Sequence, residues 1–161
     1  MVQKIKLNQD IINDEILRSL SANSQITYKK IADKLEVTSQ TISDRIKSLQ
    51  EKSQIIQSFT VKVDPAKIGY PLEFFCELDI DASMMQEILD ELTKIAEIHL
   101  IRITTGIHDI FCLGNASTVE NLYRIVEEQI SIIPGVNKTY TSITMKRVKD
   151  NQVLNLNVVY P

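Results

Sequence analysis

Apolar residues recur at helical spacing in three stretches of the first sixty residues. Within each stretch the apolar positions lie three or four residues apart, which places them on one side of a helix. Thr27 is a good N-cap for the second helix, and Thr38 or Ser39 can cap the third. The sequence predicts helices at about 10–20, 28–35 and 39–51, whose inward-facing residues are Ile12, Ile16, Leu20, Ile31, Leu35, Ile42, Ile46 and Leu49.

The segment after the third helix changes from helical spacing to alternation. Phe59, Val61 and Val63 alternate with polar residues, which predicts a short strand or ribbon. Three helices finished by such a strand form a winged helix-turn-helix, so residues 1–63 are assigned to this domain. "VDPAKIGYP" then contains two prolines and a glycine, which is typical of a linker, here residues 64–71.

Beyond the linker the pattern indicates the order strand, helix, strand, strand, helix, strand. This βαββαβ order is that of a ferredoxin-like domain, in which both helices cover one face of the sheet. Phe75 and Tyr140 are expected on the opposite face, which two copies would bury by pairing in a dimer. The alternating tail "DNQVLNLNVVYP" predicts an extra C-terminal strand. Residues 72–161 therefore form the second domain, and the fold class is α+β.

Two helices of this second domain have inward stripes of their own. Ser117 is placed to cap the second of them. The inward residues are Met85, Ile88, Leu92 and Ile95 in the first helix, and Val119, Leu122, Val126 and Ile130 in the second.

The third helix of the first domain has a polar side that suits a DNA groove. Small hydroxyl and amide side chains stand at its start, where they can approach base edges and phosphates, and long basic side chains follow. The alternative is an ordinary solvated face, and the helix pattern alone does not separate the two. The candidate DNA-binding residues are Thr27, Tyr28, Ser39, Gln40, Thr41, Ser43, Arg45 and Lys47.

Charge is distributed unevenly along the chain. Residues 1–63 contain ten Lys and Arg against seven Asp and Glu, a net +3, whereas residues 64–161 contain eight against fourteen, a net −6. A basic first part suits a protein whose first part alone approaches phosphate. The apolar runs are too short to span a membrane and the N-terminus has no long apolar stretch, so a cytoplasmic protein without a membrane partner is expected.

Side chains that carry chemistry are few and scattered. Cys76 and Cys112 lie in apolar, strand-like segments without CxxC spacing, which predicts buried free thiols. His99, on an alternating strand, is expected to pack rather than to act in catalysis. Paired carboxylates, a nucleophile elbow and a phosphate loop are absent from the sequence, so neither an enzyme, a metal site nor a cofactor is expected.

Five segments together resemble the Lrp/AsnC transcription regulators, also called feast/famine regulatory proteins. They are "DIINDEIL", "KKIADKLEVTSQTISDRIKSLQEKSQI", "VDPAKIGY", "TTGIHDIFCL" and "IPGVNKTYTSITMKRVK". Each is loose alone, but five in the right order and spacing make a specific match over nearly the whole chain. The resemblance implies a sequence-specific regulator that binds double-stranded DNA as a homodimer and often assembles into tetramers or octamers.

The resemblance also implies that the second domain senses a small amino acid at a site between dimers. In relatives a Gly-x-x-Asp hairpin and a Thr-x-Thr strand line this site. Loop amides at Gly106 can hold a carboxylate and Asp109 an ammonium; alternatively, Gly106 serves the turn and Asp109 its hydrogen bonding. The implied effector-binding residues are Thr105, Gly106, Ile107, His108, Asp109, Thr139 and Thr141.

The chain departs from the family pattern at several positions. Glu36 or Val37 stands where relatives usually have a glycine between the DNA-binding helices, and Gln54 replaces another glycine. Asp44 beside Arg45 makes the third helix less basic than in many relatives. A ligand-sensing or partner-binding module without DNA binding is therefore kept as an alternative, as is a haem-precursor decarboxylase of related architecture.

Overall fold

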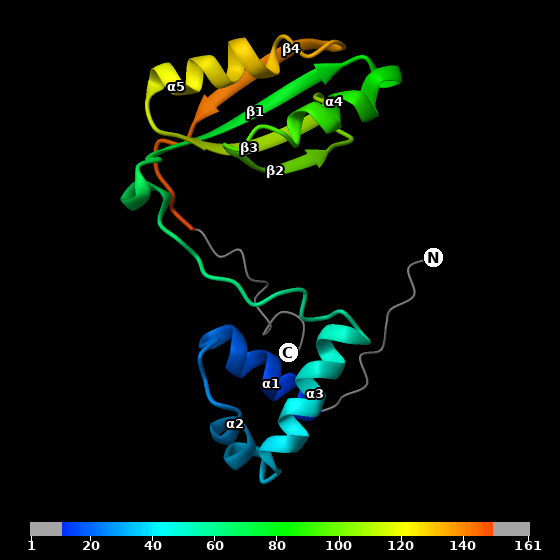
Figure 1. Ribbon diagram of the computed structural model, residues 1–161, viewed down its shortest axis with the longest axis vertical. Helices are drawn as coiled ribbons and strands as arrows, with labels where there is room; N and C mark the ends of the chain where they lie inside the picture. The colour runs from blue at the N-terminus through cyan, green and yellow to red at the C-terminus, as the bar shows by residue number, and fades with distance from the viewer. Residues whose placement is uncertain (1–10, 150–161) are drawn as a thin grey trace. The chain divides into compact units, whose positions relative to one another are not determined.

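The computed structural model describes residues 11–149 (Figure 1). Contacts divide these residues into two units, of which the first ends at Val61 and the second runs from Lys62 to Lys149. Each unit has its own cluster of buried apolar side chains. The extra strand predicted near the C-terminus, in residues 153–160, lies outside the described residues.

The first unit consists of three helices, as the hydrophobic spacing predicted. Side-chain caps begin two of them: Thr27 Oγ1 accepts the N–H of Lys30 at 3.3 Å, and Thr38 Oγ1 accepts the N–H of Thr41 at 3.1 Å. Each cap contributes about 1 kcal/mol. The helices are α1 (Ile11–Ala22), α2 (Tyr28–Leu35) and α3 (Ser39–Glu51). Their shared core is Ile16, Leu20, Ile31, Ala32, Ile42, Ile46 and Leu49.

Two residues in this unit adopt a left-handed backbone without being glycine. Glu36 ends α2 with φ of 54°, and its N–H donates to the carbonyl of Ala32. Gln54, just after α3, has φ of 52°. Each such residue carries a strain of roughly 1 kcal/mol because its Cβ crowds the backbone. The predicted strain in the turn is thus present and falls on Glu36 rather than on Val37.

The strand predicted around Phe59, Val61 and Val63 does not form in the described chain. Between α3 and the short 3-10 helix η1 (Pro65–Ile68) the structure contains no strand, and Val61 is 82% exposed. The prediction is wrong for this chain alone because a strand needs a neighbour to accept its backbone hydrogen bonds. The three-helix unit provides no sheet for it to join.

A four-stranded antiparallel sheet forms the second unit, with strand order β2-β3-β1-β4. Its strands are β1 (Leu72–Ile80), β2 (Ile98–Ile103), β3 (Ile110–Ala116) and β4 (Val136–Ile143). The helical elements are η2 (Ala82–Met84), α4 (Met85–Leu92), α5 (Val119–Tyr123) and η3 (Arg124–Ile130). This is the βαββαβ order that the sequence predicted.

The central strand β1 separates a covered face from an open face. Burial alternates along it, and Phe74, Cys76 and Leu78 are fully buried in one core with residues of α4, α5 and η3. Side chains in register with Phe75 and Glu77 point to the other face, whereas the helices of residues 62–149 pack on the face of Phe74, Cys76 and Leu78. Cys76 and Cys112 pair across β1 and β3 as buried free thiols, and desolvation raises the pKa of Cys112 to about 12.

Three details of the second unit differ from the sequence prediction. Thr118, not Ser117, caps α5, because the Thr118 hydroxyl accepts the N–H of Asn121. Val119 is 60% exposed rather than inward-facing. His99 is exposed because the register of β2 against β3 shifts between Ile98 and Leu100, which removes it from the regular alternation.

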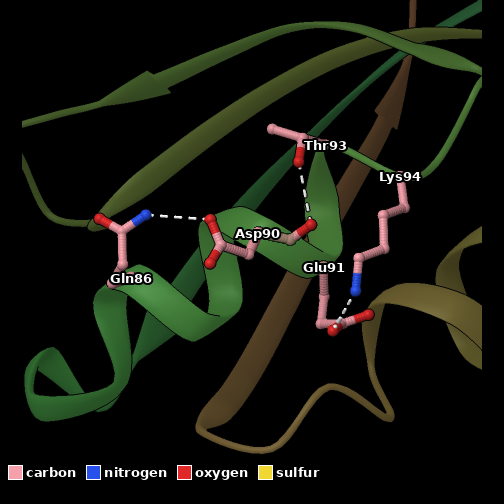
Figure 2. A network of polar contacts seen from close by, with 5 residues as sticks. All are labelled: Gln86, Asp90, Glu91, Thr93 and Lys94. Atoms are coloured by element: carbon pink, nitrogen blue, oxygen red, sulfur yellow. Dashed lines mark hydrogen bonds and ion pairs between the residues drawn. The ribbon is translucent and has the colours of Figure 1, made fainter.

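Short-range polar contacts line the exposed side of α4, as Figure 2 shows. Gln86 donates to Asp90 at 2.9 Å, and Lys94 Nζ lies 2.6 Å from Glu91. The Thr93 hydroxyl donates to the Asp90 carbonyl at 2.9 Å, near the end of the helix. Pairs at this spacing contribute about 0.2–0.5 kcal/mol each, so the network stabilises α4 locally. A separate property concerns all the helices of residues 11–149: none of them is long and apolar enough to cross a bilayer.

Replacing Glu36 with glycine should stabilise the first unit. Glycine adopts the left-handed conformation without the Cβ clash, so Glu36→Gly is expected to raise the free energy of unfolding by about 1 kcal/mol. Urea unfolding followed by circular dichroism measures the change. Asp33→Gly, inside α2, is the matched control and should lower stability by about 1 kcal/mol. A loss of stability in Glu36→Gly would contradict the assignment of strain.

Candidate nucleic-acid interface and ligand site

The polar side of α3 is only partly as predicted. Ser39, Gln40 and Lys47 are exposed, whereas Thr41, Ser43 and Arg45 are half-buried. The half-buried residues flank the stripe that packs on the core, so they border the polar surface instead of forming its centre. Thr27 and Tyr28, at the start of α2, are exposed, but the Thr27 hydroxyl already caps that helix.

An acidic residue lies in the middle of this polar surface. Asp44 is exposed, and its carboxylate accepts a hydrogen bond from Gln40 Nε2 at 2.9 Å. Gln40 is therefore held by its own helix, and one of the two hydrogens of its side-chain amide nitrogen is already used within the chain. A negative charge here also repels phosphate.

Lysines on α2 offset this charge, although they are not among the DNA-binding residues that the sequence predicted. Lys29 and Lys30 are exposed in the first turn of α2. Lys34 on the last turn is engaged differently, since its Nζ lies 2.6 Å from Glu15 of α1. This hydrogen bond lowers the pKa of the Glu15 carboxyl. The adjacent lysines that follow the Thr27 cap were the signal in the sequence, and they indicate that α2 supplies part of the positive charge.

In the second unit, Asp109 has a structural role in the β2–β3 hairpin. Its Oδ2 accepts the N–H of Ile80 at 2.9 Å, and its own N–H donates to the Leu78 carbonyl at 2.9 Å. Its carbonyl accepts the N–H of Thr104 at 2.8 Å. These contacts fix the hairpin against β1, so one carboxylate oxygen is already committed within the fold.

The fold does not explain why a glycine, Gly106, stands at the tip of the same hairpin. Gly106 has no left-handed φ, and a Cβ placed on it would meet nothing within 4 Å. The adjacent Ile107 is 94% exposed, and Thr105 is exposed as well. Among residues 11–149, neither backbone conformation nor packing requires glycine at this place. A glycine here leaves the loop amides accessible to a molecule from outside.

His108 belongs to the open face of the sheet. Its Nδ1 lies 2.7 Å from Asp79 Oδ1, and its ring lies 4.4 Å from the Tyr140 ring, centroid to centroid. Lys138 Nζ lies 4.7 Å from the centroid of that Tyr140 ring, and its hydrogen bond with Tyr140 raises the lysine pKa. His108 therefore joins the ligand-loop residues of the hairpin to Asp79 and Tyr140 on the open face.

Thr139 and Thr141 lie in a pocket between β4 and the helix formed by α5 and η3. The pocket has a volume of about 330 Å³. Thr141 Oγ1 donates to Cys76 Sγ at 3.4 Å, and Thr139 Oγ1 lies 3.5 Å from Ser131 Oγ. The lining residues are Val119, Leu122, Tyr123, Val126, Glu127, Thr139 and Thr141.

The structure thus divides the predicted effector residues into two groups. The threonines lie on the helix-covered side of the sheet, because Thr139 and Thr141 are in register with Leu78 and Cys76. The hairpin residues 105–109 do not line the pocket. In one chain, therefore, no single pocket among the described residues contains both groups. The lining residues on α5 and η3 were not in the predicted set, although their spacing of three and four residues was visible.

Comparison with known proteins agrees with both units. Residues 73–154 match the Lrp/AsnC ligand binding domain, and residues 9–56 match a winged helix-turn-helix DNA-binding domain. An uncharacterised HTH-type transcriptional regulator of Pyrococcus horikoshii is 30% identical over 138 residues, which are 86% of this chain and 87% of that protein. The HTH-type transcriptional regulator Ptr1 of Methanocaldococcus jannaschii is 29% identical over 141 residues, 88% of this chain and 95% of that one.

Solved structures share the fold. AsnC of Escherichia coli superposes with a TM-score of 0.84 at 22% identity, over 89% of this chain and 97% of that chain. A transcriptional regulator of Neisseria meningitidis, in complex with L-Met, superposes with a TM-score of 0.86 at 18% identity, over 93% and 98% of the two chains. At this identity the likeness concerns the fold.

The hydrogen bond from Ile80 to Asp109 predicts a stability effect that is independent of any ligand. Asp109→Ala leaves the half-buried N–H of Ile80 without its acceptor and should lower the free energy of unfolding by about 1–2 kcal/mol. Asp109→Asn retains an acceptor oxygen and should cost less. Urea unfolding of the three proteins measures the difference. Equal stability of wild type and Asp109→Ala would show that the bond does not hold the hairpin.

Proposed function

The chain belongs to the Lrp/AsnC family of transcriptional regulators, and we propose that it binds specific DNA sequences as an oligomer whose affinity responds to a small amino acid. The observation that carries the proposal is the combination, in one chain, of a capped helix-turn-helix with a sheet domain that offers a ligand-sized pocket. DNA binding places its site of action in the cytoplasm.

We propose that the start of α3 enters the major groove while α2 contacts the phosphate backbone. The exposed Ser39 and Gln40 stand at the N-terminal end of α3, where the helix dipole favours phosphate. Lys29, Lys30 and Lys47 supply exposed positive charge around them. Because Asp44 reduces the net charge of this surface, we expect one subunit to bind weakly and several subunits together to bind tightly.

The lysines on α2 can be tested through the salt dependence of DNA binding. Lys29→Ala combined with Lys30→Ala should weaken binding to the upstream region of the protein's own gene at every site and reduce the slope of log affinity against log salt by about 2. Gel retardation over a salt series measures both. Lys94→Ala, on α4, is the control and should leave the slope unchanged. An unchanged slope in the double variant would remove α2 from the interface.

Footprinting separates the regulator from its main alternative, a sensing module that does not bind DNA. The Gln40–Asp44 hydrogen bond is the observation that favours this alternative, since it occupies a candidate reading residue. Protection in steps of about 10 bp supports a regulator with repeated subunits on one side of the duplex. Absence of protection at low salt would favour the sensing module.

We propose that two copies of the chain pair through the open face of the sheet. Phe75 and Phe111 stack there with ring centroids 5.9 Å apart, and both rings are only half-buried in one chain. Leu113 and Tyr140 lie on the same face and are also half-buried. A second copy would remove these apolar side chains from water, which is the main driving force of such interfaces.

The effector site is proposed to form between copies. One copy contributes the hairpin, whose Gly106 exposes loop amides for an α-carboxylate. Asp109 uses Oδ2 within the fold and offers Oδ1 to an α-ammonium group. Another copy contributes the pocket that contains Thr139 and Thr141. This arrangement would explain why the two groups of residues are separate in one chain.

Gly106 provides the test of this site, because its replacement does not strain the fold. Gly106→Val should leave the melting temperature of the free protein nearly unchanged and abolish the rise caused by an amino-acid effector, as measured by thermal shift against all twenty amino acids. Gly69→Ala, at a φ of 96°, is the contrasting control: it should lower stability and retain the response. A full response in Gly106→Val would exclude the loop.

A further inference from the structure

The pocket beside β4 has a distinctive charge pattern. Glu127 provides the one carboxylate among the residues that line the pocket. No lysine, arginine or histidine lines it. The nearest basic residue along the helix, Arg124, is exposed and does not line the pocket. A negatively charged group that entered the pocket would therefore meet a carboxylate and no counter-ion.

The other polar groups of the pocket also favour a positive guest. The Thr141 hydroxyl donates its proton to Cys76 Sγ, so its oxygen faces a guest as an acceptor. Tyr123 lines the pocket and is 63% exposed, and the face of an aromatic ring attracts cations. Together with Glu127 these groups can hold an ammonium or guanidinium group, which needs acceptors and π faces.

The helix formed by α5 and η3 lines the pocket with apolar residues followed by a charged one. Val119, Leu122 and Val126 form its apolar wall, and Glu127 follows on the same side, four residues after Tyr123. η3 has wider turns than an α-helix, as the hydrogen bond from the Ser131 N–H to the Val126 carbonyl illustrates. The alkyl chain of a ligand can therefore lie on this apolar wall and place a terminal cation beside the Glu127 carboxylate.

We propose that the effector is an α-amino acid with a second positive charge on its side chain, of the lysine, ornithine or arginine class, and that Glu127 selects it. The inference rests on the proposed effector site, in which the hairpin of another copy holds the α-amino and α-carboxylate groups. The pocket then receives the side chain. Its volume of about 330 Å³ accommodates such a side chain.

The carboxylate of Glu127 is not held by another polar side chain among residues 11–149. The described contacts of residues 11–149 include neither an ion pair nor a hydrogen bond of its carboxylate. Its neighbour Glu128 is also exposed but does not line the pocket. The two adjacent glutamates differ in their relation to the pocket, which makes them a matched pair for substitution.

The test compares L-lysine with L-norleucine, which has the same alkyl chain without the terminal ammonium group. Calorimetry and thermal shift on the full chain should give at least about tenfold tighter binding of lysine, since the charged hydrogen bond is made by lysine alone. Glu127→Gln should reduce lysine binding about tenfold and leave norleucine binding unchanged. Glu128→Gln should preserve the preference of the wild type.

Failure of this inference can be distinguished from failure of the proposed function. If norleucine, leucine or methionine binds as well as lysine, or if Glu127→Gln keeps the lysine preference, the specificity assigned to Glu127 is wrong and the amino-acid site survives. If none of the twenty amino acids or norleucine binds wild type, both are wrong. Lysine binding that is weakened about tenfold in Glu127→Gln, lost in Gly106→Val and retained in Glu128→Gln supports both.

Discussion

Burial of the sheet on one face only is the constraint on which the second unit depends. Alternation along β1 sends Phe74, Cys76 and Leu78 into a core beneath the helices, and it necessarily sends Phe75 and Glu77 to the other side. The covered face gives this unit its stability. The open face retains half-buried aromatic rings, so the same alternation that folds one copy also creates a surface suited to another.

The functional groups lie where this constraint ends. The hairpin tip at Gly106 extends beyond the paired strands, and the pocket lies between the edge strand β4 and the helix formed by α5 and η3. At both places the packing within one chain leaves side chains or amides accessible to other molecules. In the first unit, likewise, the core stripe of α3 fixes which side of that helix remains free, and the proposed DNA contacts use that side.

Most features that depend on neighbouring residues were predicted correctly from the sequence, whereas several that depend on distant residues were not. Helix limits and caps followed from local rules, since Thr27 and Thr38 act on backbone within three residues of themselves. The strand at Phe59–Val63 failed, because a strand is stable only with a neighbour that local pattern cannot supply. The exposure of His99 depended on a register shift between β2 and β3, and helical spacing alone did not reveal the exposure of Val119.

The sequence by itself determined the three helices of the first unit and the βαββαβ order of the second, because these depend on periodicity and on nearby residues, and its five matching segments identified the family. Only the tertiary structure decided that Asp109 is committed to Ile80, that His108 faces Asp79, and that Glu127 joins the threonines of β4. These are relations between residues distant in sequence or on different elements. They are set by strand register and by the packing of a helix on the sheet, which linear spacing does not encode.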